Sequence, residues 1–289
     1  PFIPLQQAVF AYGEASGTVS LKNLVNSSGV VAADVAGVGT ARYNPGTAGY
    51  GNDKAIFAFG ANAGYSDISL SNLVNSSGVI AADVTGVGTA RESPSAGTYG
   101  YDKAVMAYGA NPGVVSLKNL VSNSGVVAAD VTGVGTARRF SAAAKYSDDK
   151  VIFGFGTTGS VVGVTNLCNN VGVIAADVSA VGTAREALGA APYGTDKAIF
   201  AYGTAGGGVN TRNLVSNVGV VASDASGAGT ARHYIKGATY GSDKAIFAYG
   251  YTSANVSISN LCSNTGVIAA DVSGVGTARR TLGAAGYGN

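Results

Sequence analysis

The stretch GTARRTLGAAGYGN, residues 276–289, ends this chain and closely resembles an earlier stretch, GTARYNPGTAGYGND, at residues 39–53. The earlier copy continues directly into KAIFAFG, residues 54–60, which is rich in residues that favour β-strands. The last copy ends at the point where every earlier copy continues into such a segment. The first and last units therefore differ, and this difference bears on how the two ends of the chain meet.

The whole chain is built from one repeat. The arginine of GTAR recurs at steps of 49 residues once and 47 residues four times. A segment like DKAIFAYG occurs in every period, and its first copy reads QQAVFAYG. The second unit carries two extra residues between Gly60 and Asn72. Repeats of this length are typical of solenoids and propellers.

Each period contains four short segments of Val, Ile, Phe, Tyr and Ala, separated by Gly, Asn, Ser and Asp. We name them A to D in chain order after each arginine. Examples are LGAAPYG at 188–194, DKAIFAYG at 196–203, VSLKNLV at 115–121 and GVVAADVTG at 125–133. No window long enough for a helix keeps a 3.6-residue apolar stripe without an interrupting glycine. The sequence therefore predicts an all-β chain.

Four strands per unit of this length are typical of a propeller blade, with a β-solenoid as the alternative. A solenoid needs atypical capping units at both ends. Here the chain starts at segment B and ends after a sixth segment A, so residues 280–289 supply the strand that the first unit lacks and cover an open sheet edge. We predict a six-bladed β-propeller of four-stranded blades, closed by this C-terminal strand. It forms a single domain, 1–289, whose repeats end near Arg42, Arg91, Arg138, Arg185, Arg232 and Arg279.

An arginine between segments D and A and an aromatic-glycine pair at the end of segment B make the chain similar to kelch-type β-propellers. The resemblance covers essentially the whole chain. The chain departs from that family in two respects, because the glycine is single in most units and there is no tryptophan. The near-identical units also resemble kelch-like repeats of bacteriophage and environmental virus proteins, which implies an extracellular or virion-surface setting.

Residues that recur in all six units are explained by the fold itself. Segment D aspartates, the repeated arginines and the Asp-Lys pairs make up 22 of the 34 charged residues. We expect the aspartates and arginines to form charge-assisted hydrogen bonds with the neighbouring backbone. The alternative is a ring of arginines around the channel that binds an anion. Repeated tyrosines and phenylalanines predict packing between sheets, and the small residues of segment A predict an innermost strand.

Composition excludes several classes of function. The net charge is +2 and no cluster of basic residues forms a stripe, which argues against a nucleic-acid partner. The longest apolar runs contain an aspartate and are shorter than the ~20 residues that span a bilayer, so we predict no membrane insertion. Cys168 and Cys262 occupy equivalent places in two separate units, and we expect free, buried thiols that substitute for valine.

The sequence offers little for catalysis. His233 is the only histidine, so we predict no metal site and no cofactor. No turn of the G-x-S-x-G kind marks a nucleophile. Glu92 and Glu186 occupy equivalent positions in two units, and their placement across the mouth would suit a glycoside hydrolase, which is the enzymatic alternative. A sialidase-like box is absent from the sequence. We therefore predict that the protein is not an enzyme.

Divergence between the units is confined to two of the four connections. The A to B and C to D turns scarcely change, whereas the D to A and B to C segments differ from unit to unit. Because strands alternate in direction, the two variable segments emerge on the same face. Neutral drift is the alternative, but a rigid scaffold with variable loops is typical of binding proteins.

We therefore predict a non-enzymatic binding or adhesion module whose ligand is a glycan or a protein. The predicted contacts are Tyr43, Tyr65, Asp67, Glu92, Arg139, Phe140, Glu186, His233, Tyr234, Tyr251 and Arg280. The alternative is a structural or assembly role, such as a virion decoration or fibre component. The sequence does not predict the oligomeric state.

Overall fold

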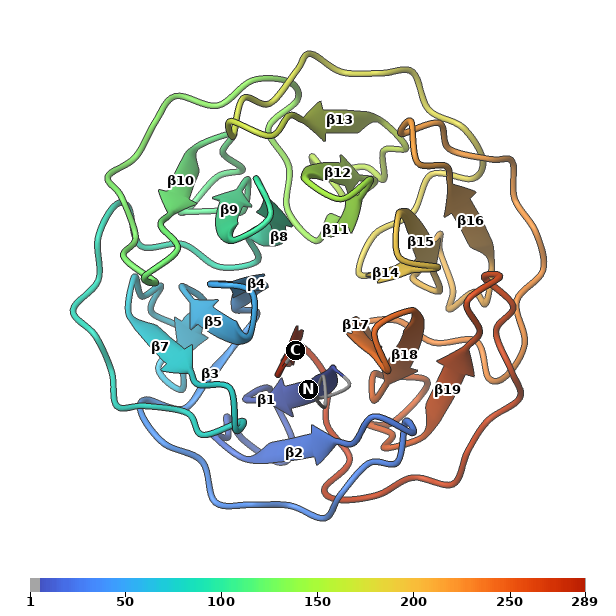
Figure 1. The fold of residues 1–289 in the computed structure, drawn as a ribbon, viewed down its shortest axis with the longest axis horizontal. Helices are drawn as coiled ribbons and strands as arrows, with labels where there is room; N and C mark the ends of the chain where they lie inside the picture. The colour runs from blue at the N-terminus through green and yellow to red at the C-terminus, as the bar shows by residue number, and fades with distance from the viewer. Residues whose placement is uncertain (1–5, 289) are drawn as a thin grey trace, which may run out of the picture.

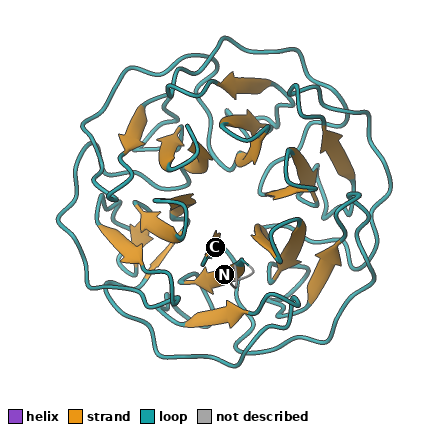
Figure 2. Cartoon of the chain, viewed as in Figure 1, coloured by secondary structure: helices purple, strands orange, loops and turns teal. Residues whose placement is uncertain are grey.

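The computed structural model describes residues 6–288 as strands, bridges and turns, without a helix among them (Figure 2). The prediction of an all-β chain is confirmed. Six three-stranded sheets and one two-stranded sheet are formed by the described residues, and every strand pair is antiparallel. The predicted chain ends, Pro1 and Asn289, lie outside the described residues.

The sheets surround a common axis in a β-propeller-like arrangement (Figure 1). Segment A supplies the strand nearest this axis in each three-stranded sheet. These inner strands are β4 (Gly46–Tyr50), β8 (Ser95–Tyr99), β11 (Ala142–Tyr146), β14 (Gly189–Tyr193), β17 (Lys236–Tyr240) and β20 (Gly283–Tyr287). They are rich in Gly and Ala, because the sheets converge here and leave little room for large side chains. The prediction of an innermost segment A is confirmed.

Segments B and C supply the other two strands of each sheet. The middle strands, from segment B, are β1 (Gln7–Ala11), β5 (Lys54–Ala58), β9 (Lys103–Ala107), β12 (Lys150–Gly154), β15 (Lys197–Ala201) and β18 (Lys244–Ala248). The third strands, from segment C, are β2 (Lys22–Val25), β7 (Ser71–Val74), β10 (Lys118–Val121), β13 (Thr165–Cys168), β16 (Arg212–Val215) and β19 (Ser259–Cys262). The two-stranded sheet joins β3 (Arg42–Tyr43) and β6 (Ala61–Asn62).

One sheet combines strands from opposite ends of the chain. β20 pairs antiparallel with β1, in a register that places Val9 opposite Ala285, and β1 pairs in turn with β2. The first and last strands accordingly lie side by side in one sheet (Figure 1). The last segment A therefore pairs with the first segment B, as the comparison of the first and last units predicted.

The prediction of four-stranded sheets is wrong in one respect, because segment D does not form a ladder. In the last unit it makes only two isolated bridges with β19, from Cys262 to Ile268 and from Ser259 to Val272. Two residues lie between the bridged positions on β19 and three on segment D. The extra residue is a bulge, which interrupts regular pairing.

A buried asparagine bridges this bulge. In the last unit, Asn260 Nδ2 donates to the carbonyl oxygen of Ala269 at 3.0 Å and to Asp271 Oδ1 at 2.9 Å. A side-chain amide thus replaces part of the backbone ladder. The same two contacts recur at the equivalent asparagines Asn23, Asn72, Asn119, Asn166 and Asn213.

Aromatic side chains fill the spaces between neighbouring sheets. The rings of Tyr12 and Phe57 lie 5.3 Å apart, and those of Phe10 and Tyr249 lie 5.6 Å apart, measured between centroids. Gly125, in a C to D turn, has a φ of 83°, and a Cβ placed on it would lie 3.0 Å from the ring of Tyr50 in the neighbouring sheet. Glycine is therefore required here by conformation and by space. The predicted packing of repeated aromatics between sheets is confirmed.

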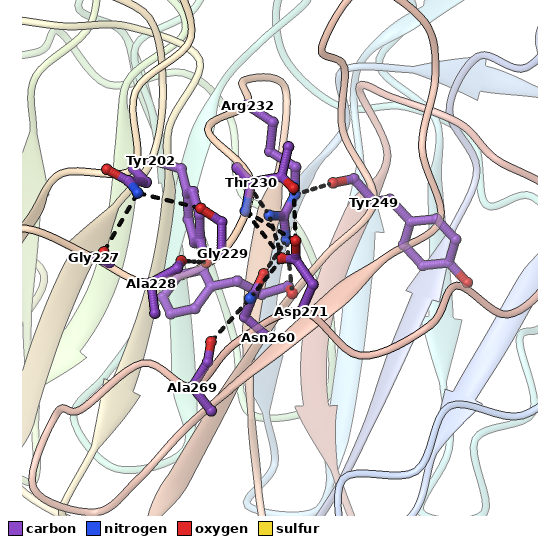
Figure 3. A network of polar contacts seen from close by, with 12 residues as sticks. Tyr202, Gly227, Ala228, Gly229, Thr230, Arg232, Tyr249, Asn260, Ala269 and Asp271 are labelled. Carbon is purple, nitrogen blue, oxygen red and sulfur yellow. Dashed lines mark hydrogen bonds and ion pairs between the residues drawn. The ribbon is translucent and has the colours of Figure 1, made fainter.

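The repeated arginines join neighbouring sheets and do not line the channel. Arg232 is fully buried, and its guanidinium carbon lies 4.5 Å from the ring centre of Tyr202 in its own unit (Figure 3). In the following unit, the carbonyl oxygen of Tyr249 accepts from Nε at 2.9 Å and Asn260 Oδ1 accepts from Nη2 at 2.6 Å. All six repeated arginines have 0% exposure, so the alternative of a channel-lining arginine ring is wrong.

Each segment D aspartate interacts with the preceding unit and not with the arginine eight residues after it. Asp271 accepts hydrogen bonds from the backbone N–H and the hydroxyl of Thr230, and lies 3.8 Å from Arg232 Nη1. Burial acts to raise the pKa of Asp271, but the hydrogen bonds from Thr230 and Asn260 and the charge of Arg232 outweigh it and lower the pKa. The expected charge-assisted bonds therefore exist, and they connect neighbouring units.

Both cysteines are free and buried, as predicted. Burial raises the pKa of the Cys168 and Cys262 thiols to about 12. Such thiols stay protonated at neutral pH and have little nucleophilic character.

Candidate functional site

The D to A and B to C segments pair with each other in every unit. Isolated antiparallel bridges join Glu14 to Arg280, Glu92 to Ala110, Arg139 to Thr157, Glu186 to Thr204 and His233 to Tyr251, and β3 pairs with β6 in the second unit. The prediction that both variable segments emerge on the same face is therefore confirmed. We call this surface the variable face.

Charged and aromatic side chains from different units meet on the variable face. Arg139 Nη1 donates to Glu92 Oε1 at 2.9 Å, and the guanidinium carbon of Arg139 lies 5.0 Å from the ring centre of Phe140. The Phe140 ring makes an edge contact with Tyr234 at 5.6 Å between centroids. Asn44 Nδ2 donates to Glu92 Oε2 at 3.2 Å. Four units thus contribute to one connected group.

The same group continues through the last units. The ring of His233 lies 4.8 Å from that of Tyr234 and 5.5 Å from that of Tyr251. The guanidinium carbon of Arg280 lies 4.9 Å from the ring centre of Tyr251, and its Nε donates to Glu14 Oε2 at 3.3 Å. All of these side chains are half-buried, so each keeps part of its surface for a ligand.

The two-residue insertion in the second unit creates the most exposed aromatic of the face. Tyr65 is 78% exposed and packs edge-on against Tyr43, with 6.1 Å between the ring centroids. Asp67 is half-buried in the same loop and bridges to Ala61. The insertion thus adds a projecting tyrosine beside the predicted contacts.

Burial and carboxylates control protonation on the variable face. Burial raises the pKa of Tyr43 to about 12, helped by the negative charges of Glu92 and Glu14. Burial and then the charge of Glu92 raise the pKa of Asp67. Burial and the positive charge of Arg280 lower the pKa of His233, so the imidazole is mainly neutral at pH 7. Its Nδ1 is buried without a hydrogen-bond partner in the described structure.

Below the variable face, six residues surround the axis. Each stands two positions after a repeated arginine and has a left-handed backbone with φ between 52° and 56°: Asn44, Ser93, Phe140, Ala187, Tyr234 and Thr281. Backbone hydrogen bonds link members from neighbouring units, such as the N–H of Asn44 to the oxygen of Thr281 at 2.7 Å and the N–H of Tyr234 to the oxygen of Ala187 at 2.8 Å. We call these residues the neck.

A central cavity of 350 Å³ adjoins the neck. The inner strands line it, mostly with small side chains and backbone, together with Lys145, Asp148 and Lys236. A second cavity of 20 Å³ lies among the neck residues and shares Ser141, Leu188 and Lys236 with the first. Lys236 therefore lies where the neck meets the central cavity.

Most of the predicted ligand contacts lie close to one another on the variable face. Glu186 lies near Tyr234, whose pKa is raised by burial and then by the charge of Glu186. Sequence reasoning missed Glu14, Asn44 and Lys236 as members of this region. Lys236 had a visible signal, because the other five units have Gly46, Ser95, Ala142, Gly189 and Gly283 at this position. Asn44 and Glu14 gave no such signal, since the positions around them vary in every unit.

Between residues 6 and 288, no group of three His, Cys, Asp or Glu side chains is arranged to hold a metal ion. Over the same range, no helix is long and apolar enough to span a membrane. Searches of protein-family models and of curated protein sequences find no significant match to this chain.

Proposed function

We infer that the chain forms one six-bladed, kelch-type propeller domain over residues 1–289, closed by β20. The inner strands contact one another in the order β4, β8, β11, β14, β17 and β20, and β20 also contacts β4. The tyrosine-glycine contacts follow the same order, and Tyr287 of the last segment A approaches Gly78 of the second unit. The extracellular or virion-surface setting stays a prediction.

We propose that this propeller is a non-enzymatic binding module and that the variable face binds a glycan. The observation that carries the proposal is the connected group of Phe140, Tyr234, Tyr251, Arg139 and Arg280. Aromatic rings supply flat apolar surfaces for sugar rings, and the neighbouring guanidinium groups supply hydrogen-bond donors that fix orientation. A protein ligand remains the alternative occupant of the same face.

The scaffold meets a second requirement for binding, which is that the contact residues are held in place. Phe140 and Tyr234 extend from neck positions whose backbone is hydrogen-bonded to neighbouring units. Arg139 and Arg280 are held by ion pairs with Glu92 and Glu14. Side chains fixed in this way lose less conformational entropy when a ligand binds.

The proposal is tested by binding to a broad glycan array and to intact bacterial cells. The native protein is compared with the double variant Phe140→Ala, Tyr234→Ala. The matched control is Tyr101→Ala, which removes an exposed tyrosine from an A to B turn at the other end of the inner strands. We expect the double variant to lose binding and the control to keep it. Equal binding by all three proteins would contradict the proposal.

A separate observation favours an assembly role as a second candidate. The first residue after each C to D turn glycine is an exposed valine in a segment that forms no regular ladder. All six are 54–65% exposed: Val30, Val79, Val126, Val173, Val220 and Val267. Repeated exposed apolar residues are typical of surfaces that contact other proteins.

This second candidate predicts that the purified protein forms oligomers. Size-exclusion chromatography with light scattering measures the mass of the native protein and of the variant Val126→Lys, Val220→Lys. An oligomer that dissociates in the variant would support assembly through segment D. A native protein that stays monomeric at micromolar concentration would contradict it.

A further inference from the structure

Lys236 is an unusual residue for its position. The inner strands otherwise place Gly, Ser or Ala at this point, where the sheets converge. Lys236 is half-buried and lines both the central cavity and the small cavity at the neck. Within residues 6–288, its ammonium group has neither a hydrogen-bond acceptor nor an ion-pair partner. A cation is thus held inside the fold without a counter-charge in contact with it.

A second polar group at the neck also lacks a partner. Ser93 is 7% exposed and lines the same small cavity as Lys236. Its Oγ is buried and has no hydrogen-bond partner in the described structure. Burying a polar group without a partner is unfavourable. Two unpartnered donors in one cavity therefore point to a ligand that accepts hydrogen bonds.

We propose that the inner end of the neck is a binding site for a small molecule bearing an oxyanion, held by Lys236 Nζ and Ser93 Oγ. The central cavity of 350 Å³ supplies room for the rest of the ligand. Thr47, Thr98 and Thr239 line that cavity, but their hydroxyls already donate to backbone oxygens of neighbouring strands. Lys145 also lines the cavity, but it interacts with the negative charges of Asp148 and Asp149, so recognition of an oxyanion at the neck rests on Lys236 and Ser93. This site is independent of glycan binding at the variable face.

The charges that face this cavity set the pH dependence. Burial lowers the pKa of Lys236 to about 8. The other charged groups on the cavity wall are Lys145 and Asp148, and the titratable phenols there belong to Tyr50, Tyr101 and Tyr193. Oxyanion binding is strongest below pH 8, where Lys236 is protonated, and weakens as the pH rises above 8.

The site is tested by competitive labelling of the native protein. Acetic anhydride modifies the lysines, and peptide mass spectrometry measures the rate at each one. Inorganic sulfate and sodium acetate are added separately, with sodium chloride at matched ionic strength as the control. Neither sulfate nor acetate titrates between pH 7 and 9, so a change with pH reports on the protein. Sulfate tests a tetrahedral oxyanion and acetate a planar carboxylate.

We expect sulfate or acetate to slow labelling of Lys236 several-fold at pH 7. The labelling rates of Lys145 and of Lys197, whose side chain is 42% exposed, should stay unchanged. Ser93→Ala should reduce the protection of Lys236 from labelling, because the Ser93 hydroxyl is one of the two groups proposed to hold the oxyanion. The substitution removes only this hydroxyl. Equal protection by chloride, or no protection of Lys236 by either oxyanion, would overturn the proposal. Because native protein is labelled, the result does not depend on the folding of a Lys236 variant.

Discussion

Arg232 and Arg139 show how one residue type serves two regions of this molecule. Arg232 belongs to the repeated GTAR motif, is fully buried and contacts two neighbouring units. The side chain of Arg139 stands one position after such a motif, is 41% exposed and pairs with Glu92 on the variable face. The bond from the repeated arginine to the buried asparagine and its contact with an aromatic ring recur in all six units, whereas the contacts on the variable face differ. Residues that repeat in all units hold the sheets together, whereas residues that vary between units are available to bind a ligand.

The largest loss of stability is expected when one of the repeated arginines is replaced. Arg232→Met should destabilise the protein by about 3–5 kcal/mol. The substitution leaves Asn260 Oδ1 and two buried carbonyl oxygens without their donor and Asp271 without its ion-pair partner. Arg139→Met is the matched control and should cost about 1 kcal/mol or less, since its ion pair is partly exposed. Urea unfolding measures both variants. Equal losses would show that the two regions are not energetically distinct.

A smaller effect is expected at the aspartate of the same contact. Asp271→Asn should cost about 2 kcal/mol at pH 7, because the hydrogen bonds from Thr230 then reach a neutral acceptor. The folded pKa of Asp271 is lowered from 3.8, so its contribution is complete above about pH 4 and is lost as the pH falls through the folded pKa.

Thermal unfolding between pH 7 and pH 2 tests this prediction. The melting temperature of the native protein should fall below pH 4, and the gap between native protein and the Asp271→Asn variant should narrow there. If the difference in melting temperature between the native protein and the variant stays constant with pH, the charge of Asp271 does not contribute to stability.

The smallest change in stability is expected at Lys236, where a substitution should stabilise the protein and not destabilise it. Between pH 8 and 10.5 the unfolded chain binds more protons at this lysine than the folded protein does, so its cost to folding diminishes as the pH rises. Lys236→Met should therefore raise the melting temperature at pH 7, and the gain should shrink near pH 10. A variant that melts lower than the native protein at pH 7 would contradict the assignment of Lys236 as a costly buried cation.

The sequence predicted the all-β class, the inner position of segment A and the pairing of β20 with β1. These features follow from local patterns, namely the repeat, the turn residues and the small residues of segment A. The sequence also predicted that the variable segments lie on one face, because consecutive strands alternate in direction. The predicted contacts Phe140, Tyr234 and Tyr251 do lie near one another.

The remaining features depend on contacts between units, which the spacing within one unit does not reveal. Segment D fails to form a ladder because the Asn260 side chain takes the place of backbone donors. Asp271 lies eight residues before Arg279 in sequence, yet its partner is Arg232 of the preceding repeat. Lys236 was visible as a departure from the repeat, but only the structure shows that it is half-buried and lines two cavities.

The central claim is that the variable face carries binding while the repeated contacts carry stability. A variant in which the three residues after every repeated arginine are replaced by those of one unit, Glu186 to Leu188, tests it most directly. This variant should melt close to the temperature of the native protein and should lose binding to the glycan array and to cells. Binding that survives this replacement in a folded variant would contradict it.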